Sequence, residues 1–355
     1  MKNTAIAWNT CVSSRHNNLN IIRFIAALAV IFSHSFSVTE GAQSAGTLLD
    51  IVTDGRLSPG GVAVAVFFVY SGILIAKSVT THTQLSSFFK KRVLRIFPEL
   101  IVCVVGSIAL VGACTTTLNA WSYFTNPATW RYMLNICMIP THALPGVFEQ
   151  NPYPSVVNAS LWTIPAQFMC YVACFVLFKL TRFNKRACGM LCLLAVAITC
   201  AYLAFAHNVM LSFVRALLEF FIGVMFYVFR DYITLKPQLA LAACVAFAAL
   251  VACGQDVIAM LVCFPYMIVW LGWGAPFVFD RFCARQDYSY GIFLWGFPMQ
   301  QLIAHLWPGV AWWQNMLLGW ICAGICAYIG VAIIAQVKKL GVACVTNKNQ
   351  NDTQK

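Results

Sequence analysis

Ten long apolar segments follow one another along this 355-residue chain, and they constrain its fold more than any other feature. Each has the length of about 17 to 25 residues that a helix needs to cross the hydrocarbon core of a bilayer. We expect membrane-spanning helices at residues 19–38, 60–76, 96–114, 158–178, 188–206, 212–229, 238–253, 257–274, 288–306 and 313–335. The sequence therefore predicts an all-α, polytopic membrane protein with about ten transmembrane helices.

Composition excludes a soluble protein. Hydrophobic residues make up 61% of the chain and charged residues only 10%, which is too few to cover a water-exposed surface. No repeat or added soluble domain is apparent. We therefore expect a single membrane-embedded domain over residues 1–355, with cytoplasmic tails at 1–18 and 338–355.

The basic charge of the chain reflects topology. The net charge is +12, and all 23 Lys and Arg residues except Arg56, Arg131 and Arg215 fall in the tails, at the start of the first span, or in alternate connections between spans. Cytoplasmic connections of membrane proteins are enriched in Lys and Arg, so both termini are expected in the cytoplasm. This placement argues against nucleic acid as a partner, and a bacterial inner membrane is the default location.

The first apolar segment carries Arg23 near its start and His34 beyond its middle. In a helix, the eleven-residue step between them leaves both within about 20° of one face, roughly 16 Å apart along the axis. An arginine at a helix end is often only an anchor at the interface. A histidine within a span is costly, and such groups tend to face a polar cavity or pathway. The pattern indicates a functional site on this face of the helix.

Arg92 and Arg95 are three residues apart, share a helix face and adjoin Lys90 and Lys91. This cluster at the cytoplasmic boundary fits two readings. It is either a topology anchor that also binds anionic lipid, or a docking site for a cytosolic polyanion whose phosphates the guanidinium groups would bind.

Arg215 and Glu219 stand four residues apart inside the sixth span. An unpaired arginine at this depth is costly, so the two side chains are expected to pair, more often for structure than for chemistry. The sixteen cysteines show no metal-ligand spacing, and several recur at helical intervals, so we read them as packing residues and expect no metal.

Five motifs occur in order along the chain: Arg23-x10-His34, the run Val66–Ile75, Arg92-x-x-Arg95 with Pro98, the run Ser160–Pro165, and the run Tyr288–Pro298. Together they resemble the acyltransferase-3 family of integral membrane acyltransferases, which modify cell-surface glycans. The similarity extends from about residue 15 to 335. Two positions differ from the family pattern: Gln167 stands where Glu is common, and Gly296 stands where many members have His. His34 is then left as the intramembrane base.

The resemblance implies an O-acyltransferase, a transferase of groups other than amino-acyl groups, with acetyl-CoA or another acyl-CoA as co-substrate and no cofactor. Arg92 and Arg95 would bind the donor phosphates, and Arg23 would bind or orient the donor. A neutral His34 would act as general base, or would itself be acylated. The acceptor would be a glycan or lipid-linked glycan, such as lipopolysaccharide O-antigen or exopolysaccharide. The acceptor-side or structural polar residues would be Ser160, Trp162, Gln167, Arg215 and Glu219.

Two other classes of protein are alternatives to an acyltransferase. A transporter or flippase for a glycan lipid would equally explain ten spans with buried polar groups, but not the family motifs. A signalling or scaffold protein with a degenerate site draws some support from Gln167.

Overall fold

The structure is a computed structural model that describes residues 6–12, 14, 16–41, 44–205, 212–275, 279, 281–283 and 286–352. The side chains of residues 6, 203–205 and 341–352 are not part of this description. Four of the Lys and Arg residues from which the topology was predicted lie outside the described residues: Lys2, Arg15, Arg285 and Lys355.

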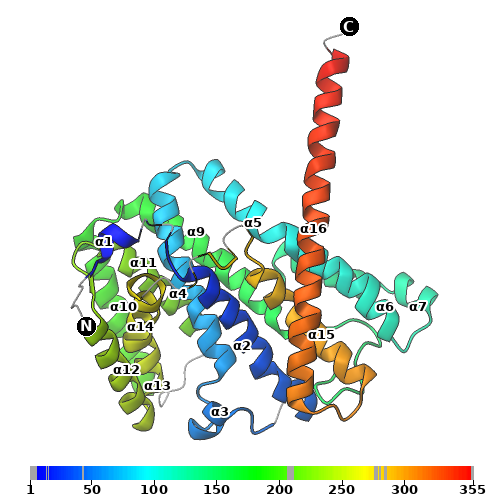
Figure 1. Ribbon diagram of the computed structural model, residues 1–355, viewed down its shortest axis with the longest axis horizontal. Coiled ribbons are helices and arrows are strands. Elements are labelled where there is room, and N and C mark those ends of the chain that lie inside the picture. The colour runs from blue at the N-terminus through cyan, green and yellow to red at the C-terminus, as the bar shows by residue number, and fades with distance from the viewer. Residues whose placement is uncertain are drawn as a thin grey trace.

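The described chain is almost entirely helical (Figure 1). The α-helices are α1 Trp8–Cys11, α2 Leu19–Glu40, α3 Leu48–Val52, α4 Pro59–Thr81, α5 Leu85–Gly106, α6 Ala113–Thr115, α7 Ala120–Thr125, α8 Pro127–Arg131, α9 Thr163–Thr181, α10 Lys185–Phe205, α11 Ser212–Val228, α12 Pro237–Ala252, α13 Asp256–Ile258, α14 Phe264–Val269, α15 Ser289–Leu306 and α16 Trp312–Asp352. Segments of π-helix (Ser107–Gly112, Ala259–Cys263, Trp270–Gly274) and 3-10 helix (Tyr132–Cys137, Ala159–Trp162) link several of them. Strands β1 (Ile6–Ala7) and β2 (Thr234–Leu235) pair antiparallel.

All ten apolar segments form helices, which confirms an all-α polytopic membrane protein. Seven helical stretches in the described part of the chain are long and apolar enough to cross a bilayer: Leu19–Glu40, Pro59–Thr81, Leu85–Thr115, Ala159–Thr181, Lys185–Tyr202, Asp256–Gly274 and Trp312–Leu340. The remaining predicted spans correspond to α11, α12 and α15. With 17 and 16 residues, α11 and α12 are short, while α15 carries the polar pair Gln300 and Gln301. The count of ten spans therefore exceeds what length and composition support.

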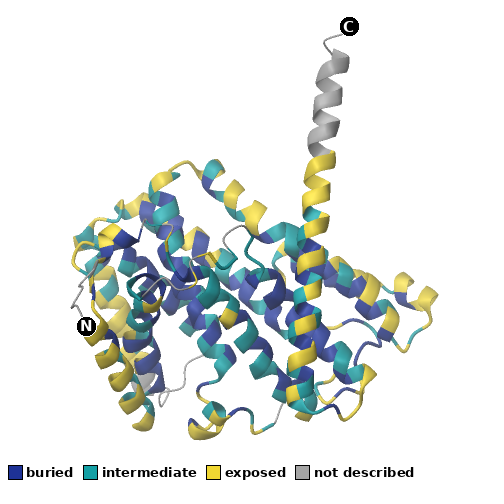
Figure 2. Cartoon of the chain, in the orientation of Figure 1, coloured by how far each residue is buried: buried dark blue, intermediate teal, exposed yellow. Residues whose placement is uncertain are grey.

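Helices α2, α4, α11 and α15 form the centre of the bundle, and α16 packs on α2 and α15. The crossing between α4 and α11 is close, with Gly72 facing Phe220 and Gly223 facing Val69. Figure 2 shows these central helices as mainly buried or intermediate, whereas α10 and α12 expose most of their residues. The exposed side chains of α10 include Leu193, Leu194 and Ile198, as expected for a helix that faces lipid.

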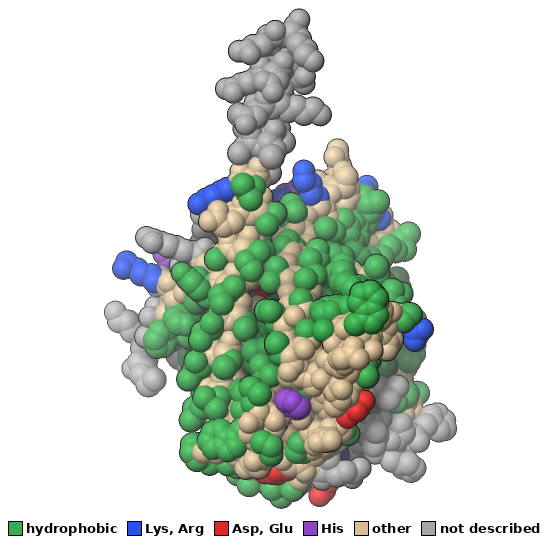
Figure 3. Space-filling view, turned by 90° about the vertical axis from the view of Figure 1, so that its right-hand side faces the viewer, with side chains coloured by type: hydrophobic (Ala, Val, Ile, Leu, Met, Phe, Trp, Pro, Cys, Tyr) green, Lys and Arg blue, Asp and Glu red, His purple; other side chains and the backbone are tan. Residues whose placement is uncertain are grey.

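The surface has the character of a membrane protein. In Figure 3, apolar side chains cover most of the face shown, Lys and Arg lie mainly toward the end from which α16 projects, and Asp and Glu lie at the other end. The connection between α2 and α4 contains one short helix, α3, which Thr47 and Asp50 cap reciprocally. Within the predicted N-terminal tail, Trp8 is fully buried and packs edge-on against Trp273.

Candidate active site

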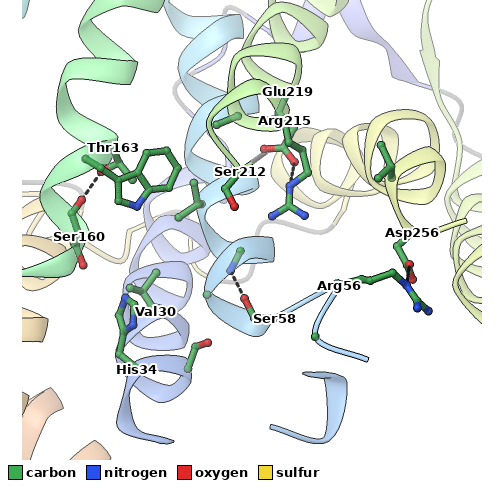
Figure 4. Close-up of a pocket in the computed structure, with 18 of the residues that line it drawn as sticks. Val30, His34, Arg56, Ser58, Ser160, Thr163, Ser212, Arg215, Glu219 and Asp256 are labelled. Atoms are coloured by element: carbon green, nitrogen blue, oxygen red, sulfur yellow. Dashed lines mark hydrogen bonds and ion pairs between the residues drawn. The ribbon is translucent and has the colours of Figure 1, made fainter. Parts of the chain in front are cut away.

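A polar cavity of about 550 Å³ lies between α2, the start of α4, the start of α9, α11 and α13. Five of the residues selected from the sequence line it: His34, Ser160, Trp162, Arg215 and Glu219. Asp54, whose side chain is 83% exposed, also lines the cavity and places one wall at the protein surface. The cavity is thus reached from the end of the molecule where Figure 1 shows α3, and Figure 4 shows the side chains that line it.

His34 comes to the cavity from the C-terminal half of α2. Its ring packs edge-on against Phe297, with centroids 5.1 Å apart and planes at 82°. Among the described residues, no hydrogen bond is formed by either imidazole nitrogen. The ring is therefore held by packing on α15, and its nitrogens are left to meet a molecule in the cavity.

Arg215 and Glu219 form the expected pair, with 3.5 Å between Nε of Arg215 and Oε1 of Glu219. The Glu219 side chain is 1% exposed, so its partner arginine supplies the compensating charge. Figure 4 shows the Arg215 guanidinium directed from α11 toward Ser58, which caps the start of α4. A side chain at Gly61 would come within 2.8 Å of this guanidinium, so glycine leaves room for it.

Asn158, which was not among the residues selected from the sequence, caps the 3-10 helix Ala159–Trp162 that leads into α9. Its side-chain amide donates to the carbonyl oxygen of Leu294 at 2.9 Å, and its oxygen accepts from the backbone N–H of Ser160 at 3.0 Å. The Ser160 hydroxyl is buried and has no hydrogen-bond partner among the described residues. The only signal in the sequence was the place of Asn158 at the entrance of the span, which is typical of a helix cap.

A second, narrow cavity of about 40 Å³ adjoins the first and is lined by Arg23 and Gln167. Val64, Thr163 and Phe293 line both cavities and form the partition between them. Gln167 donates to the Ser71 hydroxyl at 2.7 Å. The structure therefore places Gln167 in the same cavity as Arg23 and not in the one that contains His34.

The same face of α2 thus presents Arg23 to the narrow cavity and His34 to the wide one. This is the arrangement that their spacing predicted. The partition between the cavities is largely apolar, and the ring of Phe293 packs against that of Phe67 at 5.8 Å.

Arg23 and Arg95 meet at Asp287, which the sequence analysis did not single out. Both guanidinium groups contact the same carboxylate oxygen, each at 2.7 Å. Burial raises the pKa of Asp287, but the two arginines and hydrogen bonds from Ser289 outweigh it and hold the pKa at about 2. Asp287 is therefore ionised at neutral pH. Its position directly before the motif that begins at Tyr288 was the available signal.

Arg92 has partners other than Asp287. It donates to the Ser78 hydroxyl at 3.2 Å and packs over the ring of Phe88. The two arginines that share a face of α5 are therefore directed to different partners. Within the described residues, no group of three or more His, Cys, Asp or Glu side chains is arranged to hold a metal ion.

The chain is similar to three curated proteins, two of which are named as acyl or acetyl transferases. It is 27% identical over 301 residues to an O-acetyl transferase of Shigella phage Sf6, an alignment that covers 81% of this chain and 86% of the relative. It is 33% identical over 186 residues to Nodulation protein 10 of Rhizobium leguminosarum bv. viciae and 25% identical over 170 residues to Acyltransferase MdmB of Streptomyces mycarofaciens. These two alignments cover 49% and 46% of this chain, and 47% and 40% of the relatives.

No solved structure shows significant similarity to the chain. The sequence profile of one family, described as Acyltransferase domain, matches residues 16–336 and so includes both cavities and the arginine cluster. The chain therefore belongs to this family of membrane acyltransferases, as the order of its motifs indicated.

Proposed function

We propose that the protein is a membrane O-acyltransferase that moves an acyl group, acetyl in the simplest case, from cytosolic acyl-CoA to a hydroxyl of a cell-surface glycan. The observation that carries this proposal is the pair of adjoining cavities. One contains the imidazole of His34, which has no hydrogen-bond partner within the described part of the chain, and the other contains Arg23 beside two further charged groups. The location we propose is a bacterial inner membrane with both termini in the cytoplasm.

The donor would bind at the arginine end. Coenzyme A carries several phosphate charges, and guanidinium groups bind phosphate oxygens in pairs. The Arg95 side chain is 45% exposed, so it can meet a phosphate at the surface, while Arg23 lies deeper at 22%. From there the thioester arm would extend along the narrow cavity toward His34. The partition of Val64, Thr163 and Phe293 has to move aside for it.

The acceptor would occupy the wide cavity. Its volume of about 550 Å³ is within the usual range for a ligand pocket, and hydroxyl side chains, Trp162 and paired charges line it. These groups suit a sugar, which offers hydroxyls for hydrogen bonds and an apolar face for stacking. The O-acetyl transferase name of the phage relative supports a hydroxyl acceptor. O-antigen and exopolysaccharide are the acceptors we propose.

In the simplest reaction, His34 takes the proton of a sugar hydroxyl as its oxygen attacks the thioester carbonyl. The carbon–sulfur bond breaks, the thiolate of coenzyme A leaves, and the imidazolium returns its proton to the sulfur. In the alternative, His34 attacks first and an acyl-histidine passes the group to the sugar. Both routes end with a sugar ester and free coenzyme A, and both need His34 in its neutral form.

The test is incorporation of radiolabelled acetate into surface polysaccharide in cells with and without the gene. We expect base-labile label in the polysaccharide only when the gene is present. Purified protein should likewise release coenzyme A from acetyl-CoA when the polysaccharide is added. Equal labelling in the two strains, together with movement of a glycan lipid across the membrane by the protein, would instead support a flippase.

Topology gives an independent prediction. Reporter tags at either terminus should respond as cytoplasmic, and a tag inserted near Gly46 should respond as external, because Lys and Arg favour the cytoplasmic side. Protease accessibility in intact cells and in inverted vesicles would measure this. A C-terminus labelled from outside intact cells would contradict the proposed orientation.

A further inference from the structure

The contacts of Asp287 join three helices that are far apart in the sequence. Arg23 comes from the start of α2, Arg95 from α5, and Asp287 stands two residues before α15. The carboxylate is only 12% exposed, and its Oδ2 atom accepts a hydrogen bond from Arg95 and forms an ion pair with Arg23. A single oxygen thus brings together two cations that would otherwise repel each other.

The other carboxylate oxygen is fixed by the chain itself. Oδ1 of Asp287 accepts from the backbone N–H of Ser289 at 3.0 Å and from its hydroxyl at 2.6 Å. These bonds tie the carboxylate to the first turn of α15, where a negative charge is also favoured by the helix dipole. Asp287 therefore has little freedom to turn away from the arginines.

The arginines keep binding capacity of their own. A guanidinium has five N–H donors, and the contact with Asp287 uses one nitrogen of each. Two positive charges share one negative charge, so the three side chains keep one net positive charge. Arg95 is half-exposed at the surface, whereas Arg23 lines the narrow cavity. The N–H donors that Asp287 does not use are therefore available both at the surface and in that cavity.

From this geometry we propose that Asp287 is a positioning residue that holds Arg23 and Arg95 together as one phosphate-binding site for the donor. The proposal rests on the proposed acyl-CoA-dependent function and deepens it. Asp287 itself carries the wrong charge to bind phosphate and acts through the arginines. Arg92, which is bound to Ser78, is not part of this site.

The experiment compares two donors that differ in their phosphates. Acetyl-CoA carries them, whereas the acetyl thioester of pantetheine has the same reactive end and no phosphate. In Asp287→Asn, the KM for acetyl-CoA should rise about 10- to 100-fold, because hydrogen bonds to charged groups are lost, while kcat changes little. The kcat/KM for acetyl-pantetheine should stay within about threefold of wild type.

Two further variants complete the design. Asp287→Glu keeps the negative charge, but places it on a side chain that is one methylene longer. Its KM for acetyl-CoA should therefore lie between the values of wild type and Asp287→Asn. It also serves in place of Asp287→Asn if that variant does not fold. Asp231→Asn is the matched control, because Asp231 pairs with Lys185 at 2.8 Å on the surface, away from both cavities. It should behave as wild type with both donors.

An equal loss of kcat/KM for both donors in the Asp287 variants would assign Asp287 a structural role and overturn the proposal. A lower KM for acetyl-CoA would also overturn it, because Asp287 would then compete with the phosphates. A wild-type protein that transfers acetyl from neither donor would refute the proposed function. Wild-type activity combined with unchanged kinetics in Asp287→Asn and Asp287→Glu would refute only the positioning role.

Discussion

Replacing His34 with alanine is expected to lower acyl transfer by about 100- to 10,000-fold, the usual contribution of a general base. The imidazole lines the wide cavity and has no hydrogen-bond partner for its nitrogens among the described residues, so it is available to take a proton from a bound hydroxyl. The measurement is coenzyme A release by purified protein with acetyl-CoA and acceptor. Binding of acetyl-CoA should stay close to wild type, because the arginine cluster lies at the other end of α2.

His34→Gln distinguishes chemistry from packing. Glutamine keeps a polar side chain that can form hydrogen bonds, but it cannot take a proton at neutral pH. A histidine that only packs on Phe297 would tolerate it, whereas a base or an acyl acceptor would not. Ser37→Ala is the control on the same helix, since it removes only a hydrogen bond to the His34 carbonyl. Near-normal glycan acylation by His34→Gln at normal expression would show that the site has been misassigned.

The parts of the fold that depend on local sequence were predictable. Long apolar runs specify helices in a membrane whatever their neighbours are, and all ten runs are helical. Helix geometry alone predicts that Arg23 and His34 share a face. It likewise predicts that Arg215 pairs with Glu219. Whether each helix crosses a bilayer was less predictable, because α15 is polar where Gln300 and Gln301 bond to other elements inside the bundle.

The parts of the site that depend on distant contacts were not predictable. Asp287 and Arg95 are 192 residues apart, and Asn158 bonds to a carbonyl 136 residues further along the chain. No periodicity connects such positions. Gly296, which was singled out as differing from the family pattern, shows the same limit. A side chain there would come within 2.6 Å of Ile31, so close packing of α15 on α2 accounts for the glycine.

The second large effect is expected on folding, from substitutions where α4 crosses α11. Gly72→Ala and Gly223→Ala should each reduce the amount of folded protein in the membrane by about tenfold or more, because overpacking costs on the order of 1–3 kcal/mol or more against a small net stability. An alanine Cβ at Gly72 would lie 2.0 Å from the carbonyl oxygen of Phe220, and one at Gly223 would lie 2.2 Å from that of Val69. Both obstructing atoms are backbone, so no side chain can rotate away.

Small residues at helix crossings are how membrane helices approach closely, and here the approach also builds the site. The wall that α11 gives to the wide cavity carries Arg215 and Glu219, and the start of α4 gives Gly61, which leaves room for Arg215. Separating the two helices should therefore also lower acceptor-dependent turnover in whatever protein remains folded. Gly324→Ala in α16 is the matched control, because nothing lies within 4 Å of the added carbon. Size-exclusion profiles and thermal unfolding of the three variants in detergent measure the effect. Wild-type yields and melting temperatures for Gly72→Ala and Gly223→Ala would mean that α4 and α11 are further apart than described here.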